Sequence, residues 1–488
     1  MMKFIVKLPV EITLKNRPVR KRFIKILESN IKTLLRRVDQ QLNTSANEDN
    51  IDINTQDDSP ENRMSLINLL QCIPGIPYFI EVKHYKLIDV HDTFEKILAV
   101  YAKTLENKTF RVEIKRVGTH DFTSFQIEQY VTRGLNKSVE SAKVTLINPD
   151  ITIHLEIINK DLFIVIDTHR GLNGLPIGTQ KNVLSLVSGG IDSGVASYQM
   201  IQKGYLTHYC FFNLGGSAQE IFVKQLCYYL WNKYSSSHKV KFFSVDFTPI
   251  IDEFLGSVEH GEASLVLKRM MMRVAEKIAE KSNIQALITS EFIEQLSSLT
   301  LGNLNLVDRV TDIPILRPII TYDKNKIRDI TREIGIEGFT KKTSESTSVL
   351  SKSKTIKTLM SEIECEERSF NFDILDIAVR NAKIYDVQDI EQAIETEITA
   401  VDTVENIVKG AIVIDIRSPE ESENNPLNIE GVKVKHLPFY KLGSQFSELD
   451  HSTEYFLYCD HGVMSKLQAL LLMNNGFKNI KVYQPRTK

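Results

Sequence analysis

The spacing of apolar residues divides the chain into regions of different architecture. Near the N-terminus, alternating apolar residues predict a strand over residues 3–14, and apolar residues at helical spacing predict an amphipathic helix over residues 20–38. Residues 41–63 are polar apart from a short strand candidate at 51–53, so we interpret them as a loop or boundary. From 64 to 169 helix and strand patterns alternate, which predicts a small α+β domain. Its helices are predicted at 64–72 and 93–104, and its strands at 110–114, 144–146, 151–157 and 162–166.

At about residue 171 the pattern changes to that of buried parallel strands. Residues 183–187 form a nearly continuous apolar run, interrupted by Ser185, and a glycine-rich turn and a helix follow it. Similar runs recur with helices between them, which predicts a doubly wound α/β domain. The other runs are residues 208–213, 240–246 and 286–289, and the helices are residues 218–232 and 265–281. We expect residues 341–355 to be mobile, residues 361–405 to be mostly helical, and a last small α/β unit to begin at residue 412.

The composition excludes several classes of protein. The chain has 488 residues, 42% of them hydrophobic, which is enough for about three folded domains and excludes wholesale disorder. No apolar run approaches the roughly 20 residues that span a bilayer. Residues 1–22 carry only short apolar pieces between charges, unlike a secretory signal. We therefore expect a cytoplasmic enzyme without membrane attachment.

The small net charge of −2 conceals a strong asymmetry. Residues 1–40 contain six lysines and five arginines against two glutamates and one aspartate, a net charge of +8. Residues 361–430 contain five basic and 18 acidic side chains, a net charge of −13. The N-terminal stretch therefore suits a polyanion and the later stretch would repel one. The cations of helix 20–38 equally fit an ordinary solvated helix face.

The five cysteines are sparse, at positions 72, 210, 227, 365 and 459. None forms a CxxC pair, so a zinc site is not expected, nor any metal site made by protein ligands alone. An odd number of cysteines argues against a disulfide framework. The set leaves room for one reactive thiol.

A first motif with chemical meaning is Ser188-Gly189-Gly190-Ile191-Asp192-Ser193. It follows the buried strand 183–187 and opens a helix. Two glycines let the backbone approach a ligand closely, and the amides of the turn and of the helix N-terminus face an anion. The motif is not the lysine-containing phosphate loop of kinase-type nucleotide-binding proteins. It resembles the pyrophosphatase loop (PP-loop) of ATP-dependent adenylating enzymes.

A second motif surrounds Cys459, in the sequence Tyr458-Cys459-Asp460-His461-Gly462. It lies between a predicted strand, 455–458, and a predicted helix, 466–473. A cysteine among loop amides at a helix N-terminus is stabilised as a thiolate, which can accept a sulfur atom and hold it as a persulfide. Upstream, Asp415-Ile416-Arg417 ends another strand. This region resembles a rhodanese domain, whose cysteine carries sulfur.

Together with these motifs, several further stretches make the chain resemble the bacterial tRNA 4-thiouridine synthetases, also called tRNA sulfurtransferases, over essentially its whole length. The matching stretches are residues 3–7, 120–122, 176–180, 211–216, 267–271, 316–318 and 437–442. The resemblance implies a multidomain α/β and α+β protein of four domains. These are a ferredoxin-like N-terminal domain (1–60), a THUMP tRNA-binding domain (61–169), a doubly wound PP-loop ATP pyrophosphatase domain (170–395) and a rhodanese-like domain (406–488).

The resemblance implies that AMP from ATP is placed on O4 of a tRNA uridine and that a persulfide on Cys459 then delivers its outer sulfur to C4. Asp192 is expected to act in the adenylation step, together with Mg²⁺ bound with ATP. The other implied ATP contacts are Leu186, Val187, Ser188, Gly189, Gly190, Ser193, Lys268, Ser290 and Leu299, although Lys268 also fits an ordinary surface charge. The implied partners are tRNA, a cysteine desulfurase, the sulfur carrier protein of thiamine thiazole synthesis and a second copy of the chain. With the basic front, the tRNA-binding candidates are Lys21, Arg22, Lys115, Arg116, His120 and Arg133.

The chain departs from the family pattern in two places. Members with a rhodanese domain carry a second cysteine, which resolves the persulfide, where Thr347 stands here. Cys365 is a substitute candidate, and otherwise an external thiol must turn over Cys459. In the adenylate pocket the family has glycines at the positions of Ser290 and Glu294 and a glutamine at that of Leu299.

These departures leave two alternatives open beside tRNA thiolation. One is a rhodanese-type persulfide relay that serves thiamine synthesis only. The other is a tRNA-binding protein with degenerate catalytic sites.

Overall fold

The computed structural model describes most of the chain and divides it into two compact units. The described residues are 2–214, 217–257, 263–293, 300–339, 359–390, 401–407, 410–417, 422, 425–438, 442, 446, 449–450, 453–459, 463–474 and 476–485. The first unit comprises residues 1–179 and 202–204, and the second comprises residues 180–201 and 205–488. The predicted mobile segment 341–355 lies outside the described residues.

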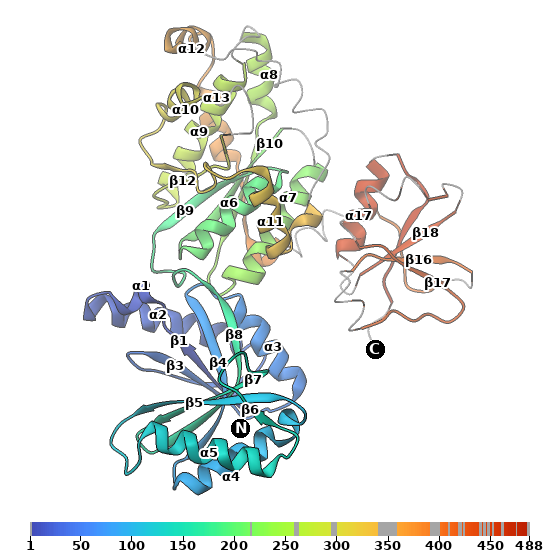
Figure 1. Cartoon of the computed structure of the whole chain (residues 1–488). Helices are drawn as coiled ribbons and strands as arrows, with labels where there is room; N and C mark the ends of the chain where they lie inside the picture. The colour runs from blue at the N-terminus through green and yellow to red at the C-terminus, as the bar shows by residue number, and fades with distance from the viewer. Residues whose placement is uncertain are drawn as a thin grey trace. The chain divides into compact units, whose positions relative to one another are not determined.

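The first unit is built on one eight-stranded sheet with the strand order β2-β3-β1-β4-β8-β7-β5-β6. Its strands are β1 (Met2–Lys7), β2 (Asn43–Ala46), β3 (Asn50–Thr55), β4 (Ile76–Lys86), β5 (Thr109–Val117), β6 (Lys143–Val144), β7 (Ile151–Ile158) and β8 (Asp161–Asn173). Its helices are α1 (Val10–Thr13), α2 (Arg17–Leu35), α3 (Pro60–Gln71), α4 (Val90–Leu105) and α5 (Ser124–Ser138). Strand β4 pairs with both β1 and β8, so the N-terminal strands and the later ones form one continuous sheet. Helices α4 and α5 lie side by side on one face of it (Figure 1).

Two predictions for the N-terminal region are wrong in detail. The strand predicted over residues 3–14 ends at Lys7, because Pro9 has no N–H for the strand ladder and instead precedes the short helix α1. Beyond it the alternation no longer follows burial, since Val10 is 64% exposed and Leu14 is 81% exposed, while Ile12 on α1 is buried in the core. In the polar segment 41–63 the strand candidate 51–53 is confirmed within β3, but the segment also contains β2 and the start of α3, which we had interpreted as a loop.

Strand β4 and helix α5 are elements that the apolar pattern did not reveal. The helix begins with a capping box, in which Thr123 and Gln126 each accept a hydrogen bond from the other's backbone N–H. The predicted helix 20–38 is confirmed as α2, whose apolar side chains from Phe23 to Leu35 are buried against the sheet. Val38 lies beyond the helix end and is exposed.

The second unit contains a six-stranded sheet with the order β13-β12-β9-β10-β11-β14. Its strands are β9 (Asn182–Val187), β10 (Leu206–Asn213), β11 (Lys241–Asp246), β12 (Leu287–Ile288), β13 (Ile315–Leu316) and β14 (Lys383–Asp386). All neighbours are parallel except β14, which pairs antiparallel with β11. The doubly wound prediction is confirmed. The stretch 361–405 was predicted as mostly helical, and the strand β14 within it is a correction.

Helices cover both faces of this sheet (Figure 1). They are α6 (Ile191–Gln202), α7 (Ser217–Leu230), α8 (Thr248–Ser257), α9 (Ala263–Lys281), α10 (Leu301–Asp308), α11 (Lys324–Ile334), α12 (Met360–Glu367) and α13 (Asp373–Asn381), with the short helices η1 (Trp231–Ser235), η2 (Glu337–Phe339) and η4 (Val387–Asp389). One buried core joins α9 to α10, α12 and α13 and to the sheet. On α6, Gly194 packs against Leu226 of α7 and against Ile336, which places α6 and α7 together.

The C-terminal part of the second unit has its own five-stranded parallel sheet, in the order β15-β19-β18-β16-β17. Its strands are β15 (Thr403–Val404), β16 (Ile412–Asp415), β17 (Lys433–His436), β18 (Tyr455–Tyr458) and β19 (Ile480–Tyr483), and its helix is α17 (Val463–Asn474). The predicted small α/β unit is thereby confirmed. In the described part of the chain, we find no helix with the length and apolar character needed to cross a membrane.

Candidate functional site

The six-stranded sheet has a topological switch point beside β9. From β9 the chain continues to β10 and β11 on one side, and it later returns to place β12 and β13 on the other. Ligands of open parallel sheets bind at the carboxyl ends of the strands at such a point. The Ser188 loop follows β9 and Thr289 follows β12, so both lie at this edge.

The Ser188 loop is held by the hydroxyl of Ser193. The Ser193 hydroxyl accepts a hydrogen bond from the backbone N–H of Ser188 at 3.2 Å and lies 2.8 Å from the carbonyl oxygen of Gly190, to which it donates. The Ser188 hydroxyl accepts from the N–H of Gly190 at 3.3 Å. Among the described residues, apart from its chain neighbours, a Cβ atom at Gly190 would meet just that hydroxyl, at 3.5 Å. The turn is therefore held by hydrogen bonds among its own residues, and its outer side is left for a ligand.

Asp192 lies in the first turn of α6, directly after the loop. Burial raises the pKa of its carboxyl group above the ordinary value of 3.8, and the positive charge of Lys324 on α11 acts in the opposite direction. A partly desolvated carboxylate at the carboxyl edge of the sheet suits binding of a cation or alignment of a donor. Sequence reasoning selected Asp192 but missed Lys324, which is 132 positions away and carries no motif.

The remaining predicted nucleotide contacts fall into three groups. Leu186 and Val187 end strand β9, and Ser290 is half-buried after β12. Lys268 is half-buried on α9. Leu299 lies outside the described residues, as does Glu294.

Two further side chains at this edge were not selected from the sequence. The Oγ1 atom of Thr289 is buried, and no described residue forms a hydrogen bond with it. The amide nitrogen of Gln219 on α7 would lie 3.3 Å from a Cβ atom built on Gly189. An unsatisfied buried hydroxyl and a close amide are groups that a polar ligand at this edge can engage.

The thiol of Cys459 follows β18 and faces the first turns of α17. Its Sγ atom accepts a hydrogen bond from the backbone N–H of Ser465 at 3.3 Å and lies 3.4 Å from the Ser465 hydroxyl oxygen. The cysteine is buried, with 8% of its surface exposed. A backbone N–H donor at a helix start is of the kind that stabilises negative charge on sulfur. Residues 460–462 of the motif lie outside the described residues.

A buried ion pair supports the strand ends beside Cys459. Arg417 donates to both carboxylate oxygens of Asp415, at 3.0 Å and 2.8 Å. Its guanidinium also lies 5.0 Å from the ring centroid of Tyr458, the residue before the cysteine. Asp415 in turn pairs with Tyr458 in the sheet. Arg417 thus orders the strand that carries Cys459.

The structure separates the other cysteines by environment. Burial raises the pKa of the Cys210 and Cys227 thiols, which therefore suit structural roles and not sulfur transfer. Cys365 is exposed on α12. The expected position of the resolving cysteine, Thr347, lies outside the described residues.

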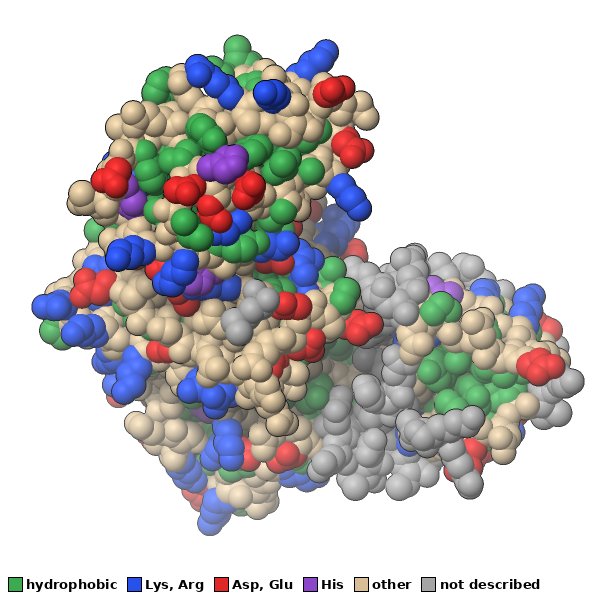
Figure 2. All heavy atoms as spheres, turned by 90° about the horizontal axis from the view of Figure 1, so that it is seen from below, with side chains coloured by type: hydrophobic (Ala, Val, Ile, Leu, Met, Phe, Trp, Pro, Cys, Tyr) green, Lys and Arg blue, Asp and Glu red, His purple; other side chains and the backbone are tan. Residues whose placement is uncertain are grey.

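The predicted tRNA-binding residues form two groups. Lys21 and Arg22 are exposed on α2, which packs against β2 at one edge of the eight-stranded sheet. Lys115 on β5 and Arg133 on α5 are exposed, and β5 is the strand next to the other edge of the sheet. Figure 2 likewise shows lysine and arginine side chains spread widely over one face, with acidic side chains between them.

Arg116 and His120 are committed to internal contacts. The Arg116 Nη1 atom lies 3.0 Å from Nδ1 of His120, and Nε2 of His120 lies 2.6 Å from the carbonyl oxygen of Asn159. Because arginine can only donate, His120 accepts at Nδ1 and donates at Nε2, which is the neutral tautomer. Both side chains are half-buried and support the turn after β5, and their role in tRNA binding stays a prediction.

Four family models match the chain in the order of the four regions. They are "ThiI ferredoxin-like domain" over residues 3–79, "THUMP domain" over 88–167, "Thiamine biosynthesis protein (ThiI)" over 178–372 and "Rhodanese-like domain" over 399–484. The predicted set of domains is thereby confirmed. The boundaries that we placed at residues 60, 169, 395 and 406 stay predictions.

Relatives of the same length are similar to the whole chain. A tRNA sulfurtransferase of Colwellia psychrerythraea is 61% identical, with 99% of this chain and 100% of the relative covered. One of Tolumonas auensis is 49% identical over the same shares. Among solved structures, a 4-thiouridine synthetase–RNA complex with bound ATP is similar with a TM-score of 0.71 and 25% identity, covering 79% of this chain and 99% of that one.

Proposed function

Because the chain belongs to the tRNA sulfurtransferase family, we propose that it converts a uridine of tRNA to 4-thiouridine with ATP as co-substrate. The observation that carries this proposal is the Ser188–Ser193 loop at the switch point of the sheet, with Asp192 beside it. Further support comes from the similar solved structure, whose title names a 4-thiouridine synthetase, RNA and bound ATP.

In the first step, O4 of the uridine attacks the α-phosphorus of ATP, and pyrophosphate leaves. The carbonyl oxygen, a poor leaving group, becomes part of AMP, a good one. The accessible amides of the Ser188 loop and the N-terminus of α6 would bind the phosphates. Lys268, Ser290 and the unpaired Thr289 hydroxyl are the further candidates for contacts to the nucleotide.

A Mg²⁺ ion bound with ATP fits this site through Asp192. Magnesium in phosphate-transfer sites takes most of its ligands from phosphate oxygens and water, and needs only one or two carboxylates. Among the described residues, no group of three or more His, Cys, Asp or Glu side chains could hold a metal ion alone. One carboxylate at the loop therefore suits an ion that arrives with the nucleotide.

In the second step, the outer sulfur of a Cys459 persulfide attacks C4 and displaces AMP, which leaves a Cys459–S–S–C4 adduct. A second thiol then attacks the sulfur of Cys459, so that a disulfide forms on Cys459 and the tRNA keeps the sulfur as a thione. The second thiol comes from Cys365 or from an external dithiol, because Thr347 cannot act in this way. A cysteine desulfurase would supply the persulfide sulfur, and a homodimer would bind the tRNA.

A second candidate function is sulfur donation to the carrier protein of thiamine thiazole synthesis. It is favoured by the match of residues 178–372 to the family model "Thiamine biosynthesis protein (ThiI)". If the chain were only such a relay, it would need Cys459 but not Asp192. A tRNA-binding protein without catalysis would need neither residue.

The test is a reconstituted reaction with a cysteine desulfurase, cysteine, ATP, a dithiol and unmodified tRNA, followed by nucleoside analysis. We expect 4-thiouridine from the wild type and a loss of at least about 100-fold in Asp192→Asn and in Cys459→Ser. Cys365→Ser is the matched control for the thiol change. If it loses product only when the dithiol is omitted, Cys365 is the resolving thiol. Absence of 4-thiouridine from the wild type would refute the proposal.

A further inference from the structure

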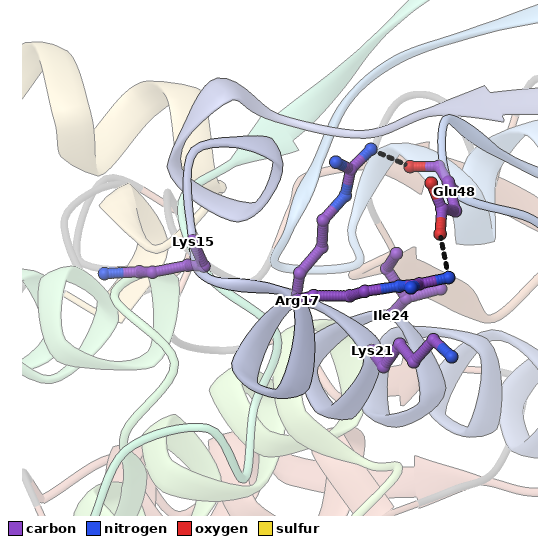
Figure 3. Close-up of a pocket in the computed structure, with 6 residues that line it drawn as sticks. Lys15, Arg17, Lys21, Ile24 and Glu48 are labelled. Atoms are coloured by element: carbon purple, nitrogen blue, oxygen red, sulfur yellow. Dashed lines mark hydrogen bonds and ion pairs between the residues drawn. The ribbon is translucent and has the colours of Figure 1, made fainter.

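A pocket of about 230 Å³ lies between the start of α2 and the turn that joins β2 to β3 (Figure 3). Its lining contains four cationic side chains and one acidic one. The lining residues are Lys15, Arg17, Arg20, Lys21, Ile24 and Glu48. Of these residues the sequence analysis named Lys21 individually, and the other three cations lie in the basic stretch 1–40 that it predicted to suit a polyanion. Glu48 was not selected, because it lies on a turn about 30 residues later in the chain.

The backbone adds to the positive charge of the pocket. Helix α2 begins at Arg17, and the side chain of Asn16 caps it by accepting a hydrogen bond from the N–H of Val19. The first turn of a helix carries a partial positive charge and usually attracts acidic side chains. That of α2 contains no acidic residue and begins with an arginine. The helix dipole and the cationic side chains therefore both favour binding of an anion in the pocket at the start of α2.

Glu48 is the anion that the chain itself supplies to this pocket. Its carboxylate lies 3.7 Å from Nη2 of Arg17, and both side chains are mostly exposed, at 62% and 78%. An exposed pair at that separation is weak and is readily exchanged for a stronger anion. Figure 3 shows Lys15 extending away from Glu48, on the rim.

Arg20 holds the turn that carries Glu48. Its Nη2 atom donates to the carbonyl oxygen of Glu48 and lies 3.3 Å from a carboxylate oxygen of Asp49. Its Nε atom is buried and has no hydrogen-bond partner among the described residues. Arg20 thus fixes the turn that forms one side of the pocket.

We propose that this pocket binds one phosphate group of the RNA backbone and that Glu48 is a built-in counter-anion which the phosphate displaces. The inference rests on the proposed function, since it assigns a contact of the tRNA. A volume of about 230 Å³ is below the range of pockets that enclose whole small molecules, roughly 300–1,000 Å³, and suits a single phosphate group. The exposed guanidinium of Arg17 matches a phosphodiester, which it can bind with two parallel hydrogen bonds.

The test compares tRNA binding by the full-length wild type with Arg17→Gln and Glu48→Gln over a range of salt concentrations. Arg17→Gln should raise the Kd about tenfold and reduce the salt slope by about one, because one phosphate contact is lost. Glu48→Gln should lower the Kd about two- to threefold, since the competing charge is removed. The matched controls are Lys25→Gln, on an exposed position of α2 that does not line the pocket, and Glu106→Gln, an exposed glutamate of the same unit.

Two results would overturn the inference. One is a change in the Kd for tRNA that is no larger for Arg17→Gln than for Lys25→Gln, or that is the same for Glu48→Gln and Glu106→Gln. The other is binding of inorganic phosphate or pyrophosphate that depends on Arg17 while tRNA binding does not, which would make the pocket a site for a free anion. The outcome is separate from that of the proposed function. If Arg17→Gln weakens tRNA binding but the wild type forms no 4-thiouridine, the pocket stands and the function fails.

Discussion

Arg269 on α9 and Glu367 on α12 form a buried ion pair with two hydrogen bonds. Nε donates to Oε1 at 2.6 Å and Nη2 donates to Oε2 at 3.0 Å, while Arg269 is only 2% exposed. Arg269 also donates to the carbonyl oxygen of Leu306. The pair therefore joins the helix that carries Lys268 to the helix that carries Cys365, and it connects both to α10.

We predict that Glu367→Gln lowers the free energy of unfolding of the second unit by about 3 kcal/mol, because it leaves the Arg269 charge buried without its counter-charge. The measurement is the urea midpoint of the transition that unfolds this unit. The control is Asp376→Asn, which removes the exposed partner of Lys277, also on α9. It should leave the midpoint unchanged. Equal midpoints for the two variants would contradict the prediction.

Asp192→Asn should stabilise the protein at neutral pH while it abolishes thiolation. Burial raises the pKa of this carboxyl group, so the folded state binds the proton more tightly than the unfolded state does. Its contribution to stability therefore falls as the pH rises from 3.8 through the raised pKa, and the asparagine removes this loss. We expect a higher urea midpoint at pH 7 than in the wild type and a smaller difference near pH 3.

The exposed residue Asp252 on α8 provides the control for this experiment. Asp252→Asn should change neither the midpoint at pH 7 nor the activity. A lower midpoint for Asp192→Asn at pH 7 would show that the carboxylate stabilises the fold and does not serve only the site.

Lys115 and Arg116 are neighbours on β5 for which we predict opposite consequences. Lys115→Gln should weaken tRNA binding, reduce the salt slope by about one and leave the thermal midpoint unchanged, because the side chain is exposed. Arg116→Gln should lower the thermal midpoint, since its contact with His120 is lost. The measurements are tRNA binding at several salt concentrations and thermal unfolding. If Lys115→Gln shifted the thermal midpoint and Arg116→Gln did not, Lys115 and not Arg116 would be the residue that stabilises the fold.

His208 on β10 should make stability depend on pH below neutrality. Burial lowers its pKa to about 4, and Nδ1 accepts a hydrogen bond from the N–H of Lys241. In the unfolded state the imidazole is protonated below about pH 6.5, whereas in the folded state it is protonated only below about pH 4. The free energy of unfolding therefore falls as the pH falls from 6.5 to 4. At pH 5 the loss from this group is about 2 kcal/mol. In His208→Gln the difference between urea midpoints at pH 7 and pH 5 should be smaller than in the wild type.

The amino-acid sequence by itself predicted those elements whose pattern of apolar residues matches the burial of these residues in the fold. Buried parallel strands such as β9 read as continuous apolar runs, and the Ser188–Ser193 loop and Cys459 each stand between a strand and a helix within a few residues. Each of these features is formed by residues close together in the chain, so it can be recognised from the sequence alone. The alternation after Leu8 misled because Pro9 ends the strand. In the polar hairpin, the strand candidate 51–53 is confirmed within β3, whose alternate residues are buried, whereas β2 has no buried side chain to mark it.

Only the tertiary structure decided which charged side chains belong together. Lys324 acts on Asp192, Glu367 neutralises Arg269, and Glu48 meets Arg17, although each pair is separated by between 31 and 132 positions in the chain. The fold likewise brings Arg116 against His120, while the tRNA-binding role of both residues stays a prediction. Pairing and burial of charges depend on which elements pack together, and no spacing along the chain records that packing.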